Sequence, residues 1–232
     1  MNIKLHYEEK GDGFPLILLH GNGGSLEYFV NQTDHFSKFY RVIAIDSRGH
    51  GRSERGKAEF SIKQFADDLY IFMRSHGIEK AHILGFSDGG NVALYFVLSH
   101  PEMVERLVLN GANIDPSGVK RRYQAPIEKD YATALASAET DGEAKKNAEM
   151  LGLMVNWPKI RTQELSALTM PTLVIAGTND MIKKTHTQII AENIPGAKLV
   201  FLEGDHFIAY KVPEEFNRIV GDFLSGRDFS DE

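Results

Sequence analysis

The sequence predicts an α/β fold with a mostly parallel central sheet, helices on both faces of the sheet and a small helical cap. Short apolar runs rich in β-branched residues alternate with helical stretches, which is typical of βαβ units. Polar or glycine-rich loops follow several of these runs directly, at the sheet edge where α/β proteins build their sites. Between residues 113 and 167 the strand-like runs disappear and Ala, Glu and Lys dominate, which predicts the cap.

In chain order, the first expected strand is the N-terminal segment 1–9, where apolar and polar residues alternate. Each later strand is indicated by a short apolar run that ends in turn-forming residues. We expect these later strands at residues 14–19, 41–45, 81–84, 105–110, 172–177 and 198–202.

The clearest helix spans residues 61–76. Ser61 and Gln64 match a capping box at its start, and Gly77 is a typical stop after its end. Apolar side chains recur along it at helical spacing, so this face is expected to pack on the sheet. Further helices are expected over residues 92–99, 183–193 and 213–224, the last one opened by Pro213.

The chain divides into an α/β core of residues 1–112 and 168–232 and an inserted cap of residues 113–167. Apolar residues recur at helical spacing within the insertion, so we interpret it as two or three short helices. A cap of this size covers little, and we expect a modest, partly open pocket below it. The apolar positions are Ala144, Ala148, Leu151 and Val155.

Composition narrows the class of protein. The chain has 232 residues, 42% hydrophobic and 25% charged, which suits one domain with a single large core. A net charge of −6 and the lack of a basic stripe argue against nucleic acid as a partner. The chain contains no cysteine, which excludes disulfides, a thiol nucleophile and cysteine-based metal sites.

No apolar run has the length of a signal-peptide core or of a membrane span. We therefore expect a cytoplasmic protein with no membrane partner, present as a monomer or homodimer. No metal and no cofactor are expected, because the chain has no histidine pair at zinc spacing and no carboxylate cluster. The glycine-rich segment 21–24 lacks the lysine that ends a phosphate-binding loop.

The most informative motif is Gly-Phe-Ser-Asp-Gly-Gly at residues 85–90, directly after the strand expected at 81–84. A strand that ends in such a turn and continues as a helix holds its serine in a strained, exposed position at the helix N-terminus. The glycines allow the strand and the helix to pass close together. Ser87 is therefore the candidate nucleophile.

A serine hydroxyl needs a base that accepts its proton and an acid that orients this base. Asp180 and His206 each follow an expected strand, so both lie at the same sheet edge as Ser87. Asp115 is the nearby rival for the acid. Asp205 is expected to form the turn beside the histidine.

The order serine, acid, histidine resembles that of the α/β-hydrolase superfamily. Residues 20–24, His-Gly-Asn-Gly-Gly, look like the oxyanion loop of that family, and residues 46–53 resemble its D-x-R-G-x-G-x-S loop. The resemblance covers nearly the whole chain. Within the superfamily, the chain looks most like the biphenyl-hydrolase-like proteins of the valacyclovir-hydrolase type, on residues 87–90, 111–113 and the C-terminal stretch 214–224.

The resemblance implies a serine hydrolase that cleaves small carboxylic esters through an acyl-enzyme. The backbone N–H groups of Asn22 and Asp88 would form the oxyanion hole, with Gly23 as the alternative to Asn22. Residues 46–53 would brace the sheet edge and the oxyanion loop. Carbon–carbon bond hydrolases and lactonases share these motifs, and a small-molecule receptor on the same scaffold is the alternative outside enzymes.

The residues expected to contact the substrate are Asp88, Gly23 and Trp157. A carboxylate directly after the nucleophile opposes the negative charge that develops in an oxyanion hole. One hypothesis is that Asp88 pairs with a substrate ammonium group, as in an α-amino acyl ester. The alternative is that its side chain joins a hydrogen-bonded network behind the turn. Trp157 either packs the end of the cap or lines the pocket.

Overall fold

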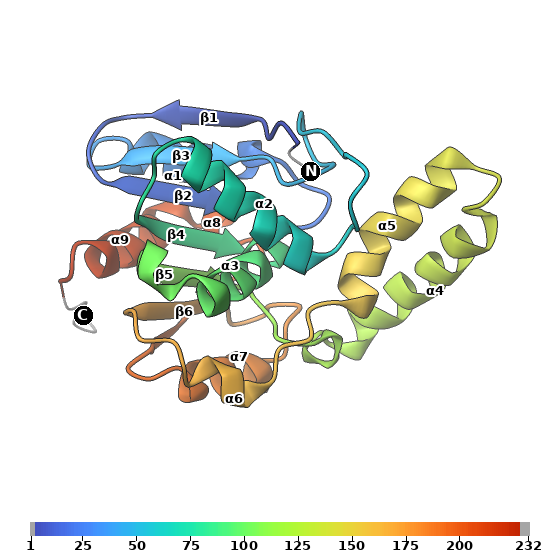
Figure 1. The fold of residues 1–232 in the computed structure, drawn as a ribbon. Helices are drawn as coiled ribbons and strands as arrows, with labels where there is room; N and C mark the ends of the chain where they lie inside the picture. Colours follow the sequence, from blue (N-terminus) through green and yellow to red (C-terminus); the bar gives the residue numbers. More distant parts are fainter. Residues whose placement is uncertain (1–2, 228–232) are drawn as a thin grey trace.

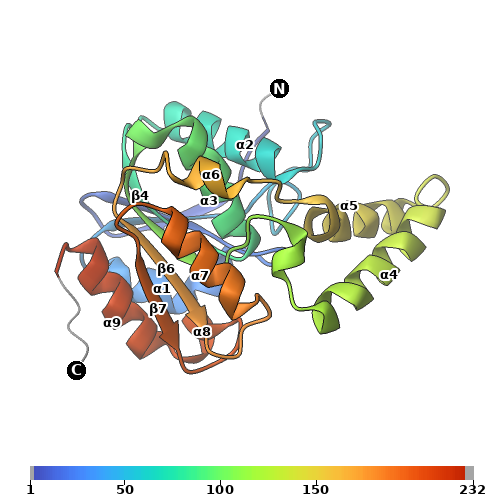
Figure 2. The same ribbon diagram turned by 90° about the horizontal axis from the view of Figure 1, so that it is seen from below.

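A sheet between two layers of helices forms the centre of the computed structural model, which describes residues 3–227 (Figures 1 and 2). Its strands are β1 (Tyr7–Lys10), β2 (Pro15–Leu19), β3 (Arg41–Ile45), β4 (Ala81–Phe86), β5 (Val104–Asn110), β6 (Thr172–Gly177) and β7 (Lys198–Leu202). Within the described residues the order across this seven-stranded sheet is β1-β3-β2-β4-β5-β6-β7. Neighbouring strands are parallel except β1 and β3. The predicted α/β fold with a mostly parallel sheet is confirmed.

Helices cover both faces of the sheet (Figures 1 and 2). One face carries α2 (Ile62–Ser75), α3 (Asp88–Ser99) and α7 (Lys184–Asn193), and the other carries α1 (Val30–Phe36), α8 (Ile208–Lys211) and α9 (Pro213–Leu224). The central strands β2, β4 and β6 are therefore buried on both sides, which explains why they read as continuous apolar runs.

The first strand is shorter than predicted. β1 begins at Tyr7, whereas alternation in the sequence predicts a strand from residue 1, and residues 1 and 2 lie outside the described part. Tyr7 pairs with Ile45, the last residue of β3, so no strand partner remains further toward the N-terminus. The carbonyl of His6 accepts the N–H of Asp46 from the following loop instead, at 2.9 Å.

Helix α2 contains half of the predicted capping box. The Ser61 hydroxyl accepts the backbone N–H of Gln64 at 3.2 Å, as a helix N-cap does. The Gln64 side chain does not complete the box but donates to Asp68, one turn further on, at 3.2 Å. Gly77 follows the helix with a φ of 64°, a left-handed conformation that glycine adopts without strain.

The segment after β5 contains η3 (Pro116–Gly118), α4 (Arg121–Ser137), α5 (Gly142–Asn156) and α6 (Thr162–Leu165). Helices α4 and α5 form a hairpin that projects beyond the carboxyl ends of the parallel strands (Figure 1). With 17 and 15 residues they are longer than the short helices predicted. Leu153 of α5 is fully buried and joins the core beside the sheet. The division of the chain into a core and a cap stays a prediction.

The loop after β3, residues 46–53, is held by buried polar groups. The Asp46 carboxylate accepts the N–H of Leu26 and the N–H of Arg52, both at 2.8 Å. The fully buried Arg48 guanidinium donates two hydrogen bonds to Asp68 of α2, at 2.7 and 2.6 Å, and a third to the Arg55 carbonyl at 2.9 Å. These contacts fasten the loop to Leu26 and to α2, although the loop has no regular structure of its own.

Removal of the Asp68 carboxylate should strongly destabilise the fold. In Asp68→Ala the buried Arg48 charge loses its partner, so we expect the free energy of unfolding to fall by about 3–5 kcal/mol. The neighbouring Asp67 is exposed, and Asp67→Ala should change this free energy by less than about 0.5 kcal/mol. Urea denaturation of both variants measures the difference, and equal losses would contradict the role given to the buried pair.

Candidate active site

Ser87 lies on the sharp turn between β4 and α3. Its φ of 53° and ψ of −121° make it the single non-glycine residue with positive φ among residues 3–227. The turn needs glycine on both sides: a Cβ on Gly85 would lie 2.4 Å from the carbonyl oxygen of Gly89, and one on Gly89 would lie 2.0 Å from that of Leu19. The strained backbone is held by a hydrogen bond from the Ser87 N–H to the Asn110 carbonyl, at 2.8 Å.

The structure brings Ser87, His206 and Asp180 together in one hydrogen-bonded line. His206 Nε2 lies 3.0 Å from Ser87 Oγ, and His206 Nδ1 lies 2.7 Å from Asp180 Oδ1. His206 is 5% exposed and Asp180 2% exposed, so water is largely excluded from the second contact. The three residues follow β4, β6 and β7, whose carboxyl ends meet at one sheet edge. This is the geometry that a nucleophile, its base and an orienting acid require.

The two other carboxylates considered from the sequence point elsewhere. Asp115 accepts the N–H of Ser117 at 2.8 Å and caps η3. Asp205 accepts the N–H of Phe207 at 2.9 Å and binds the Lys211 ammonium group, whose hydrogen bond holds the pKa of this carboxyl below its usual value. Asp180 is thus the carboxylate that contacts His206 in the described part of the chain.

Gly111 is a site residue whose role was not predicted. It follows β5 with a φ of 61°, and a Cβ there would lie 2.9 Å from the ring of His206 and 3.2 Å from Asp180. Any other residue would push into the histidine. The signal in the sequence is a glycine placed directly after a strand that ends at the site.

The two expected oxyanion donors, the backbone N–H groups of Asn22 and Asp88, belong to segments that lie next to Ser87. Asp88 is the first residue of α3, so its N–H has no partner within the helix. The loop of residues 20–24 approaches from the other side: a Cβ on Gly21 would lie 3.1 Å from the Cβ of Ser87. Among residues 3–227, neither the N–H of Asn22 nor that of Asp88 donates to another group. Gly23 is exposed at the tip of the loop.

The His20 side chain is hydrogen-bonded to this loop and to the segment that follows β3. Its Nε2 accepts the N–H of Ser47 at 3.0 Å, so its Nδ1 carries the proton and donates to the Gly21 carbonyl at 2.7 Å. Burial, with the neighbouring His50, lowers the pKa of His20 to about 4. The ring is therefore neutral near pH 7 and joins the loop to the segment that follows β3.

The side chain of Asp88 belongs to a buried hydrogen-bonded network. Its Oδ2 accepts the side-chain amide of Asn22 and its Oδ1 that of Asn91, each at 3.0 Å. The side chain is 7% exposed, and this burial raises the pKa of the carboxyl. Of the two roles considered for Asp88, the network is the one whose contacts are present.

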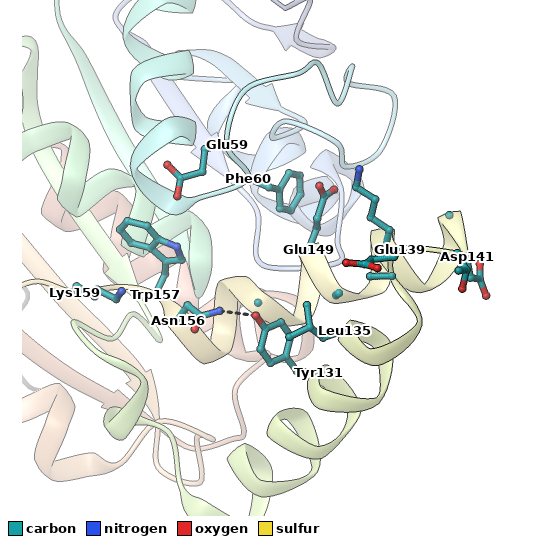
Figure 3. Close-up of a pocket in the computed structure, with 16 residues that line it drawn as sticks. Glu59, Phe60, Tyr131, Leu135, Glu139, Asp141, Glu149, Asn156, Trp157 and Lys159 are labelled. Atoms are coloured by element: carbon teal, nitrogen blue, oxygen red, sulfur yellow. Dashed lines mark hydrogen bonds between the residues drawn. The ribbon is translucent and has the colours of Figure 1, made fainter.

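Trp157 lies away from the hydrogen-bonded line. It packs edge-on against Tyr95, with ring centroids 5.9 Å apart, and lines a groove of about 850 Å³ between the hairpin and the segment before α2 (Figure 3). Phe60 and Tyr131 line the same groove, in which Tyr131 accepts a hydrogen bond from Asn156 at 3.2 Å. Ser87, Asp180 and His206 are not among the residues that line this groove.

Two further properties bear on the class of site. Within residues 3–227, no group of three or more His, Cys, Asp or Glu side chains is arranged to hold a metal ion. In the same range, no helix combines the length and the apolar character needed to cross a membrane.

The buried His20 should make stability depend on pH. An unfolded histidine binds a proton near pH 6.5, but the folded His20 does so only near pH 4. Between these values the unfolded state holds more protons, so the free energy of unfolding should fall as pH decreases, by up to about 1.4 kcal/mol per pH unit for this group. Urea denaturation from pH 7 to about 4 should show a shallower fall for His20→Gln, and equal slopes would contradict this assignment.

Comparison with known proteins places the chain in a family. The family model of the alpha/beta hydrolase fold matches residues 15–133. The human serine hydrolase BPHL is 28% identical over 248 residues, covering 96% of this chain and 83% of that protein.

Solved structures agree with this placement. Est816, described as an N-acyl homoserine lactone degrading enzyme, superposes with a TM-score of 0.80 at 27% identity, over 95% of this chain and 97% of that one. CumD, a meta-cleavage product hydrolase from Pseudomonas fluorescens IP01, gives a TM-score of 0.79 at 27% identity, over 97% and 95%. Together with the sheet order and the turn at Ser87, these matches show that the chain belongs to the alpha/beta hydrolase fold family.

Proposed function

We propose that this protein is a serine hydrolase that cleaves small carboxylic esters through an acyl-enzyme intermediate. The observation that carries the proposal is the hydrogen-bonded line from Ser87 Oγ through His206 to Asp180, with distances of 3.0 and 2.7 Å. A serine hydroxyl is a weak nucleophile by itself, and this arrangement supplies the base and the orienting acid that it needs.

In the proposed reaction, Ser87 Oγ attacks the ester carbonyl while His206 Nε2 accepts its proton. The carbonyl oxygen becomes negative and is bound by the backbone N–H groups of Asn22 and Asp88, each worth roughly 3 kcal/mol of transition-state stabilisation. His206 then protonates the departing alcohol. Water repeats the sequence on the acyl-enzyme and releases the acid. Asp180 keeps the imidazole in the required tautomer and stabilises its charged form.

Relatives keep two other reactions open on the same residues. Est816 is described as degrading a lactone, which is a cyclic ester, and CumD is a meta-cleavage product hydrolase. Both kinds of substrate could be presented to Ser87. Lactone and carbon–carbon bond hydrolysis are therefore the alternatives to assay beside simple esters, and tight ligand binding without turnover would favour a receptor.

A preference for α-amino acyl esters receives less support. The two oxygens of Asp88 already accept amide N–H groups from Asn22 and Asn91, and the side chain is buried. A substrate ammonium group would have to displace or share these donors. Neutral small esters are accordingly the first substrates of choice.

Ser87→Ala should abolish turnover. Without the hydroxyl no acyl-enzyme can form, and we expect kcat on p-nitrophenyl esters to fall by at least about 10³-fold. Ser137→Ala is the matched control, because this serine is exposed on α4 and far along the chain from the site. Steady-state kinetics on both variants, with mass spectrometry for an acylated Ser87, provide the test. Full activity in Ser87→Ala would overturn the proposal.

Asp180→Asn should slow turnover without unfolding the protein. An amide at this position favours the wrong imidazole tautomer, which lowers kcat by about 10³- to 10⁴-fold in serine triads. Asp115→Asn changes the other candidate acid, which caps η3, and should keep kcat within about twofold of the unaltered protein. The reverse ranking of the two variants would show that the acid has been assigned to the wrong residue.

A further inference from the structure

The side chain of Asn22 has both of its amide hydrogens engaged. Its Nδ2 donates to Asp88 Oδ2 at 3.0 Å and to the backbone carbonyl of Met150 in α5 at 2.9 Å. An amide group carries two hydrogens, so these bonds fix the orientation of the Asn22 side chain completely. One anchor lies on the helix that follows Ser87, and the other lies on the projecting hairpin.

The Asp88 carboxylate connects this loop with the interior. Its Oδ1 accepts Asn91 Nδ2 at 3.0 Å, and Asn91 exchanges two further hydrogen bonds with Asn113, from Nδ2 to Oδ1 at 3.0 Å and from the Asn113 N–H to Asn91 Oδ1 at 2.9 Å. Asp88, Asn91 and Asn113 are 7%, 0% and 7% exposed. The network therefore runs from the oxyanion loop through α3 to the loop after β5, and each member is held on more than one side.

The peptide that carries the Asn22 N–H is held on one side through its Gly21 carbonyl, which accepts His20 Nδ1 at 2.7 Å and the N–H of Gly24 at 3.2 Å. It lies in a turn between Gly21 and Gly23, and Gly23 is exposed with a φ of 67°. Glycine on either side widens the range of conformations that this peptide can adopt. The bonds of the Asn22 side chain to Asp88 and Met150 are the second support of the peptide, on the side of α3 and α5.

We propose that Asp88 is a positioning residue, whose carboxylate holds Asn22 so that the Asn22 N–H meets the substrate oxyanion. This inference rests on the proposed serine hydrolase function and assigns the Asp88 side chain a task separate from that of its backbone N–H. Asparagine at residue 88 could accept only one of the two amide donors and would turn its own NH₂ group toward the other.

Whether removal of the Asp88 charge slows or accelerates the reaction distinguishes a positioning role from a purely electrostatic one. A negative charge beside an oxyanion raises the energy of the transition state, so removal of the charge by itself should accelerate the reaction. If Asp88 positions Asn22, Asp88→Asn should instead slow the reaction. A displacement of the oxyanion donor by about 1 Å is enough for a loss of roughly 10²-fold.

The test compares the unaltered protein and Asp88→Asn on a matched pair of esters, one α-amino acyl and one neutral. We expect kcat to fall by about 10- to 100-fold on both esters, with KM changed by less than about threefold, because the lost contact acts in the transition state. A loss confined to the amino ester would show that Asp88 binds a substrate cation. Unchanged or faster turnover on both would also overturn the proposal.

A fluorophosphonate probe separates this inference from the proposed substrate class. Ser87 Oγ forms a bond to phosphorus, fluoride leaves, His206 takes the proton, and the phosphoryl oxygen occupies the oxyanion site. The rate constant of labelling should fall in Asp88→Asn by a factor similar to that for kcat. If the unaltered protein is labelled but cleaves no ester, the proposed function fails while the labelling rates still decide the role of Asp88.

Asn22→Ala tests the same contact from the other side and keeps the proposal testable if Asp88→Asn does not fold. Its kcat should fall similarly, and the double variant should lose little more than the more damaged single variant, because both act through one hydrogen bond. Independent losses that multiply would contradict the proposal. Asn156→Ala is the control: it removes an exposed amide contact to Tyr131 on the same hairpin and should leave kcat within about twofold.

Discussion

The close crossing of β4 and α3 at Ser87 is the constraint on which the rest of the site depends. Helix α3 passes so close to β4 and β2 that a Cβ on Gly85 would lie 2.4 Å from the carbonyl oxygen of Gly89, and one on Gly89 would lie 2.0 Å from that of Leu19 in β2. This crossing places Ser87 in a strained conformation with its hydroxyl outward and the first N–H of α3 beside it. The same steric requirement therefore positions the proposed nucleophile and one proposed oxyanion donor at one point of the chain.

Buried polar contacts, more than regular structure, hold the loops around this point. Asp46 ties the loop after β3 to Leu26, the Arg48–Asp68 pair ties the same loop to α2, and the neutral His20 joins this loop to residues 20–24. Groups of this kind stabilise only when every partner is present, because a lone buried charge or amide is costly. The Asp88 carboxylate and the Asn91 amide are likewise stabilised only as long as their hydrogen-bond partners are present. The rigidity of the site thus comes from satisfied polar networks packed against an apolar core.

The hairpin is coupled to the site through few contacts. The Asn22 side chain donates to the carbonyl of Met150. The adjacent residue, Glu149, accepts two hydrogen bonds from the Arg55 guanidinium, at 2.6 and 2.8 Å. Both contacts fall on one turn of α5, while most of the hairpin projects away from the sheet (Figure 2). These contacts join the hairpin to the loop of residues 20–24 beside Ser87 and to the segment before α2.

The sequence by itself determined the succession of strands, most of the helices and the residues that follow each strand, because apolar periodicity and turn chemistry are local properties. It placed Ser87, Asp180 and His206 at one sheet edge for this reason. Helices α1 and α8 were not predicted. Only the tertiary structure decided which carboxylate contacts the histidine, where the Asp88 side chain points and that Trp157 lines a separate groove. Those outcomes depend on side-chain directions and packing between segments far apart in the chain, and local pattern carries no information on either.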